Sequence, residues 1–142
     1  MEETDDQSNW TLAEATDEDG IPTMFRIRQI EPVGDQQEKL NIIWEYGPDC
    51  EFGMPSEDEL SRMNECEELL TEFQFESGTC CLVAVLTGDG IRQWILYSSD
   101  IQSFGDFVND SFPAYPPYPI EINHESDPEW NEYNELSELL RS

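Results

Sequence analysis

Positive charge is scarce in this chain and gathers on two segments with strand patterns. Three of the six Lys and Arg residues lie there, Arg26 and Arg28 on one segment and Arg92 on the other. Residues two apart share a face of a strand, so Arg26 lies beside Arg28. Arg92 lies beside Trp94 in the same way. Guanidinium groups bind carboxylates and phosphates through paired N–H donors. The four side chains predict a sheet face for an anionic ligand, and the ordinary alternative is pairing with acids across neighbouring strands.

The side chains that most often carry catalysis or hold metals lack a supporting pattern. His124 is the single histidine, and no G-x-S-x-G nucleophile motif is present. The cysteines form no C-x-x-C pair, and a zinc site needs about four converging ligands, usually Cys or His. They are Cys50, Cys66, Cys80 and Cys81, which we expect to be free thiols. We predict no catalytic residue, no metal site and no cofactor, and the question of enzyme activity leans towards a non-enzyme.

Two short loops match known ligand loops only in part. Residues 17–20 (D-E-D-G) resemble a calcium loop, but its first and twelfth positions would be Ala15 and Arg26, which are not calcium ligands. Residues 87–90 (T-G-D-G) are too short for a phosphate-binding loop and lack its lysine. Both loops are therefore predicted to be turns.

The overall charge excludes several classes of partner. The chain has 142 residues with 33 Asp and Glu against 6 Lys and Arg, a formal net charge of −27. Such a chain repels nucleic acids and anionic membranes and attracts basic proteins and cations. No apolar run approaches the roughly 18 residues of a membrane span, and residues 1–10 lack the regions of a secretory signal. We therefore expect a cytoplasmic protein with a basic protein partner.

The acids also concentrate on one face of a predicted helix. Ser56 and Glu59 form a capping box, which predicts a helix from about Ser56 to Phe75. Helical spacing places an apolar stripe on one side of it, made of Leu60, Met63, Cys66, Leu70 and Phe73. The opposite side gathers Glu57, Glu65, Glu68 and Glu72. These four acids are a candidate docking surface for the basic partner, and the alternative is an ordinary solvated helix face.

Short apolar blocks between turn residues define the other elements and argue against a disordered chain. The predicted order is β-β-β-α-β-β-α-β-α. The remaining segments are a hairpin at Trp10–Ile30, strands at Leu40–Tyr46, Thr79–Leu86, Ile91–Tyr97 and Ile120–His124, a helix capped by Asp100, and a helix from about Pro128 to Leu140. The prolines of Pro113–Pro119 impose an extended path.

Hairpin connections dominate this order, so the sheet is expected to be mainly antiparallel. With two helices packed on the sheet and a short C-terminal helix in addition, the chain is predicted to be an α+β two-layer sandwich. Residues 1–8 are expected to form a flexible acidic N-terminus, and residues 9–142 a single domain.

Three strings of residues carry a family resemblance. They are G-M-P-S-E-D-E-L-S-R-M-N at 53–64, L-V-A-V-L-T-G-D-G-I-R-Q-W-I-L-Y-S-S-D at 82–100 and Y-P-I-E-I-N-H-E-S-D-P-E-W-N-E-Y at 118–133. With Trp10 and the Gly20-Ile21-Pro22 turn, the chain resembles bacterial "domain of unknown function 695" proteins over about residues 9–134. The resemblance implies no established activity and no catalytic residues. Some relatives resemble, or are fused to, inhibitor domains like those that regulate ribonuclease E, which implies regulation through protein–protein contact.

Three hypotheses stay open at this point. The first is a non-enzymatic inhibitor, immunity-like or regulatory protein that docks a basic protein through its acidic surface. The second is a small enzyme or anionic-ligand-binding domain that uses the face of Arg26, Arg28, Arg92 and Trp94. The third is that the acidity reflects a saline host and carries no functional message. The sequence specifies neither the identity of a partner nor an oligomeric state.

Overall fold

The computed structural model describes residues 10–16, 22–28, 34–46, 57–88, 90–113 and 118–139. The elements are β1 (Trp10–Thr16), β2 (Pro22–Arg28), β3 (Glu38–Glu45), α2 (Glu57–Ser77), β4 (Cys80–Gly88), β5 (Ile91–Ser98), α3 (Ile101–Ser111), β6 (Ile120–Ser126) and α4 (Asn131–Leu139). Their order confirms the predicted order and the α+β class. Predictions at residues 1–8 and 17–20, Cys50, Ser56 and residues 114–117 lie outside the described residues. No described helix is long and apolar enough to cross a membrane.

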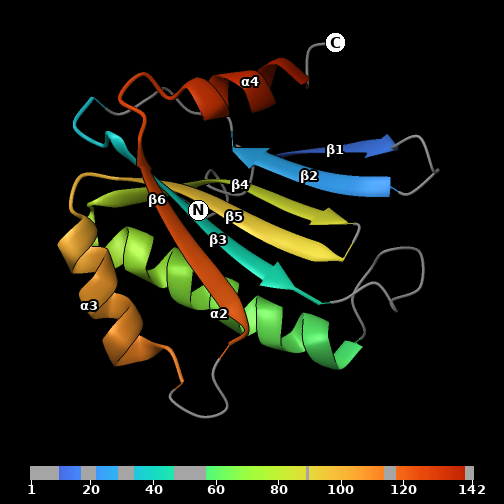
Figure 1. The fold of residues 1–142 in the computed structure, drawn as a ribbon, viewed down its shortest axis with the longest axis horizontal. Coiled ribbons are helices and arrows are strands. Elements are labelled where there is room, and N and C mark those ends of the chain that lie inside the picture. The colour runs from blue at the N-terminus through green and yellow to red at the C-terminus, as the bar shows by residue number, and fades with distance from the viewer. Residues whose placement is uncertain are drawn as a thin grey trace, which may run out of the picture.

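The six strands form one sheet in the order β1-β2-β4-β5-β3-β6 (Figure 1). Every neighbouring pair is antiparallel, and the predicted hairpin is present, with Trp10 opposite Arg28. The β4–β5 hairpin lies between β2 and β3, although β2 and β3 follow one another in the chain. This insertion places Arg26 on β2 and Arg92 on β5 on either side of the single strand β4.

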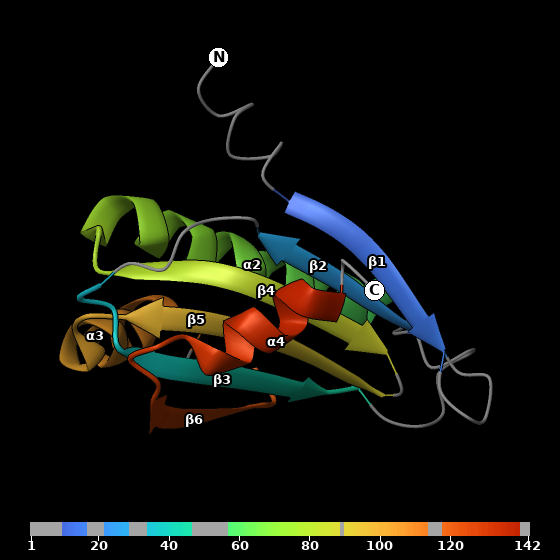
Figure 2. The ribbon, with the colours of Figure 1, turned by 90° about the horizontal axis from the view of Figure 1, so that it is seen from above.

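Helices α2 and α3 cover one face of the sheet, and α4 lies across the other (Figures 1 and 2). The predicted stripe of α2 faces the sheet: Met63, Cys66, Leu70 and Phe73 are buried, and Leu60 is partly buried against them. They pack on strand residues that include Ile42, Trp44, Leu82, Trp94 and Leu96. The predicted cap of α3 is confirmed, since the Asp100 carboxylate accepts the Ser103 N–H at 3.1 Å.

An irregularity in β4 sets which of its side chains face α2. The register with β5 shifts between Leu82 and Ala84, which marks a β-bulge at Val83. Val83 and Ala84 both pack under α4, whereas Leu82 and Val85 both pack under α2. The bulge therefore restores Val85, and with it Thr87 two residues on, to the face that also carries Arg26 and Arg92. The sequence of β4 is a nearly continuous apolar run because both faces of the strand are covered, by α2 on one side and α4 on the other.

The helix α4 begins at Asn131, later than the predicted start near Pro128. The cause is Trp130, whose φ of 57° lies in the left-handed region and cannot continue an α-helix. Packing holds this conformation in place. The indole is fully buried, stacks on Tyr97 at a centroid distance of 4.2 Å, and donates its Nε1–H to the Gln36 carbonyl at 2.7 Å.

Asp127 caps this delayed helix. Its carboxylate accepts the backbone N–H groups of Asn131 at 2.9 Å and Glu132 at 3.1 Å, and the Tyr97 hydroxyl donates to it at 2.7 Å. The helix N-terminus is thus tied to the centre of the sheet through one buried carboxylate.

Candidate functional site

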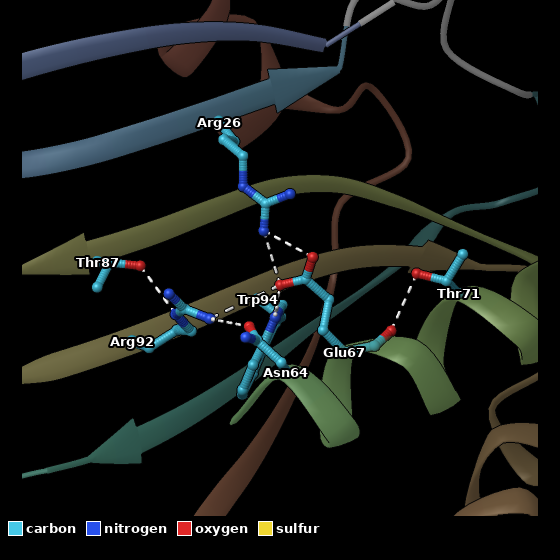
Figure 3. Close-up of polar contacts among 7 residues, drawn as sticks. All are labelled: Arg26, Asn64, Glu67, Thr71, Thr87, Arg92 and Trp94. Carbon is cyan, nitrogen blue, oxygen red and sulfur yellow. Dashed lines mark hydrogen bonds and ion pairs between the residues drawn. The ribbon is translucent and has the colours of Figure 1, made fainter. Parts of the chain in front are cut away.

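Two arginines from different strands converge on one carboxylate of α2 (Figure 3). Arg26 donates Nη2–H to the two carboxylate oxygens of Glu67 at 2.7 and 2.6 Å. Arg92 approaches the same carboxylate from the other side of β4, with Nη1 at 3.9 Å from Oε1. The sheet brings the arginines together, and α2 supplies the acid between them.

Neutral groups complete the surroundings of the two charges. Trp94 donates its Nε1–H to Glu67 at 3.0 Å. Arg92 donates Nε–H to the Thr87 hydroxyl at 2.9 Å and Nη1–H to Asn64 at 3.5 Å. Burial is the main cause that lowers the pKa of Arg92, and the charge of Glu67 opposes it. A guanidinium nevertheless stays protonated in proteins, so Arg92 is a buried positive charge.

A cavity of ≈ 360 Å³ opens beside these arginines. Its described lining combines polar and apolar side chains: Arg26, Thr87 and Arg92 on one part, and Leu12, Met24, Leu60 and Val85 on the other. No acid belongs to this described lining. The arrangement is able to hold a group that is both anionic and apolar.

The structure does not bring the four residues of the predicted arginine and tryptophan face together on one surface. Arg26 and Arg92 share one site, but Trp94 is fully buried beneath Glu67 and presents no surface. Arg28 donates Nη1–H to the Gln74 side chain at 2.6 Å, and the same Gln74 oxygen accepts the Leu82 N–H at 2.7 Å.

Sequence reasoning missed the acid that holds the site together. It expected the arginines to meet either a ligand or acids across neighbouring strands, whereas Glu67 comes from a helix. A signal was available: Glu67 follows Met63 by four residues and precedes Leu70 by three, so helical spacing places it beside the buried stripe. Thr87 was also missed, because only the bulge at Val83 turns it towards Arg92.

The second predicted site, the acidic face of α2, is exposed to solvent. Glu57, Glu65, Glu68 and Glu72 are all exposed. Three of them border a groove of ≈ 310 Å³ between α2 and the segment that follows α3, and its described lining is Glu65, Glu68, Leu69, Glu72, Ser111, Pro113 and Tyr118. Glu57 does not line this groove. Phe75, one turn beyond Glu72, is 61% exposed and was not singled out from the sequence.

One lining residue of the groove, Tyr118, belongs to a small aromatic and cationic stack. The Tyr118 hydroxyl donates to Glu65 at 3.1 Å, and burial followed by this hydrogen bond raises the pKa of Tyr118 to about 12. The Arg62 guanidinium lies 5.2 Å from the centroid of the Tyr118 ring and 5.8 Å from that of Trp44. Glu68 and Glu72 have no hydrogen-bond or ion-pair partner within the described part of the chain.

The histidine and the described cysteines occupy ordinary surroundings. His124 lies on β6 with its Nε2 at 2.6 Å from a carboxylate oxygen of Glu38, on an exposed part of the sheet edge. Burial raises the pKa of Cys66 and of Cys80 to about 12, so both are protonated thiols at neutral pH. Within the described ranges, no three His, Cys, Asp or Glu side chains are grouped to hold a metal ion.

The model of the family of unknown function DUF695 matches residues 8–137. The chain belongs to this family. This confirms the resemblance that the sequence strings indicated. The matched range includes both the arginine cluster and the acidic face of α2, so each lies within the family domain. Comparison with curated proteins and with solved structures finds no match.

Proposed function

We propose that this chain is a non-enzymatic interaction protein that binds a basic protein partner in the cytoplasm through the acidic face of α2. One observation carries the proposal: Glu65, Glu68 and Glu72 are exposed in succession along α2 and border a groove whose lining also includes Leu69 and Tyr118. Figure 1 shows α2 along one face of the sheet, and the three glutamates are exposed side chains of this helix.

The acids on this face repel one another. Glu68 lies three residues after Glu65 and four before Glu72, and like charges at these spacings destabilise a helix by a few tenths of a kcal/mol per pair. Neither Glu68 nor Glu72 meets a cation among the described residues. A cation from a partner would relieve this repulsion, which is a reason for such a row to be complementary to a basic surface.

The groove offers a partner apolar contacts in addition to the charges of the glutamates. Leu69 and Tyr118 form apolar lining beside the three carboxylates. A lysine or arginine side chain has an aliphatic stem and a charged tip, so its stem can cover this lining while its tip meets the acids. Exposed Phe75 adds a ring at the end of the same face, where it is available to a cation from the partner.

A pair of matched double variants tests the proposal. Glu68→Gln with Glu72→Gln removes two charges from the face, and Glu121→Gln with Glu135→Gln removes two exposed charges from β6 and α4. Immobilised wild-type chain should retain a specific basic protein from the host's lysate at low salt and release it in about 0.5 M salt, where screening is strong. The β6 and α4 variant should retain it equally, and the α2 variant should lose it.

Two results would contradict the proposal. Retention of the same proteins by all three chains would show that the acidic face of α2 does not determine which partner binds. Equal loss from both double variants would show that the charge acts in bulk, as expected if the acidity only reflects a saline host.

A further inference from the structure

We infer that the cavity beside Arg26 and Arg92 binds a small monocarboxylate with an apolar body. The inference rests on the arginine cluster and not on the acidic face of α2, so it stands apart from the proposed function. It starts from two positive charges beside one cavity. Arg26 and Arg92 both line the cavity and both face Glu67, and no acid belongs to the described lining.

Arg92 keeps one donor nitrogen for a ligand. Its Nε–H is donated to Thr87 and its Nη1 faces Asn64 and Glu67. Its Nη2 has no hydrogen-bond partner among the described residues, while the residue as a whole is only 9% exposed and lines the cavity. A buried guanidinium with an unused donor favours an acceptor that carries negative charge.

The apolar part of the lining is exposed without a cover. The described residues include five exposed large hydrophobic side chains, and two of them, Leu12 at 67% and Met24 at 38%, line this one cavity. Leu60 and Val85 extend the apolar surface inwards. An apolar ligand body removes this surface from water, and burial of apolar area is favourable.

Charge and size select the ligand class. Two guanidinium groups attract an anion, and a single carboxylate adds only one negative charge to the site. A dianion such as phosphate would add a second negative charge in a field that is already strongly negative. A volume of ≈ 360 Å³ lies at the lower end of ligand pockets, which run from about 300 to 1,000 Å³. A carboxylic acid with a short alkyl or aryl chain fits these limits.

The direct test is an NMR titration of the full chain with 4-phenylbutyrate. The indole N–H of Trp94 reports on the site, because it is hydrogen-bonded to the same Glu67 that Arg26 and Arg92 face. Its resonance is assigned with a Trp94→Phe variant. We expect a saturable shift with 4-phenylbutyrate and binding at least about tenfold weaker with the neutral 4-phenylbutyramide, since hydrogen bonds to charged groups are the stronger ones.

A matched pair of variants locates the binding. Leu12→Glu puts a negative charge at the mouth of the cavity on β1, and Ile122→Glu puts the same charge on β6 at the opposite edge of the sheet. Both replaced side chains are exposed, so both chains should fold. The first variant should lose the response to 4-phenylbutyrate and the second should keep it. No saturable shift, an equal response to the amide, tighter binding of inorganic phosphate, or equal binding by both variants would overturn the inference.

Discussion

At the scale of single residues, Glu67 decides whether two arginines can face each other across β4. Its carboxylate accepts hydrogen bonds from Arg26 and from the Trp94 indole, and it lies 3.9 Å from Arg92. Without its charge, Arg92 would keep only neutral partners in a buried place. Glu67 therefore holds the cluster together, whatever else binds beside it.

Replacing Glu67 by glutamine should lower the free energy of unfolding by about 2–3 kcal/mol, the cost of leaving a mostly buried charge without its counter-charge. Glu68→Gln is the matched control one residue along the same helix, where the side chain is exposed and has no described partner. The control should change the unfolding free energy by no more than about 0.5 kcal/mol. Urea unfolding of both variants makes the comparison, and equal effects would mean that the arginine cluster contributes nothing to stability.

At the scale of elements, one irregularity in the sheet and one before a helix decide which side chains meet. The bulge at Val83 turns Thr87 towards Arg92. The left-handed conformation of Trp130 makes α4 begin at Asn131, whose N–H the Asp127 carboxylate caps. Burial acts to raise the pKa of Asp127. Hydrogen bonds from Asn131, Tyr97 and Glu132, with the charge of Lys39, outweigh burial and lower this pKa below its usual value.

This lowered pKa predicts a pH-dependent difference between wild type and Asp127→Asn. A carboxyl whose folded pKa is depressed stabilises the fold above its ordinary pKa of about 3.9, and this stability is lost as pH falls through the folded pKa. At neutral pH, the free energy of unfolding of the variant should therefore be about 1–2 kcal/mol lower than that of wild type, which is the usual cost of losing a helix cap. The gap should narrow as the pH falls towards about 3.

Urea unfolding across this pH range measures the gap. Asp106→Asn, an exposed position on α3, serves as the control and should show almost no gap at any pH. A gap for Asp127→Asn that stays constant or widens on acidification would contradict the role of the ionised cap.

The same elements show how far sequence reasoning reaches. Period and capping signals predicted the element order, the stripe on α2 and the Asp100 cap, because these depend on neighbours in the chain. The placement of β4 and β5 between β2 and β3 depends on pairings between distant segments, which local patterns do not encode. The positive φ of Trp130 was hidden for the same reason: it is held by Tyr97 and Gln36, which lie far away in the sequence.

At the scale of the whole molecule, the described cations are shielded from solvent, whereas most of the described acids are exposed. Every described Lys and Arg residue is buried or half-buried: Arg26, Arg28, Lys39, Arg62 and Arg92. Lys39, for example, is buried and lies 3.2 Å from Glu132 and 3.8 Å from Glu125. The described surface is thus more uniformly negative than the net charge alone conveys. Such a field accelerates association with basic partners.

A negative field over the whole surface does not by itself select a docking face, so we propose that a basic partner contacts α2 in preference to the other acidic surfaces. The most direct measurement is an NMR titration of the full chain with a short arginine-rich peptide, with backbone amide shifts followed along the sequence. The proposed docking surface predicts that shifts concentrate at Glu65, Glu68, Glu72 and Phe75 and disappear in the variant with Glu68→Gln and Glu72→Gln. Shifts of similar size on β6 and α4, unchanged in that variant, would contradict it.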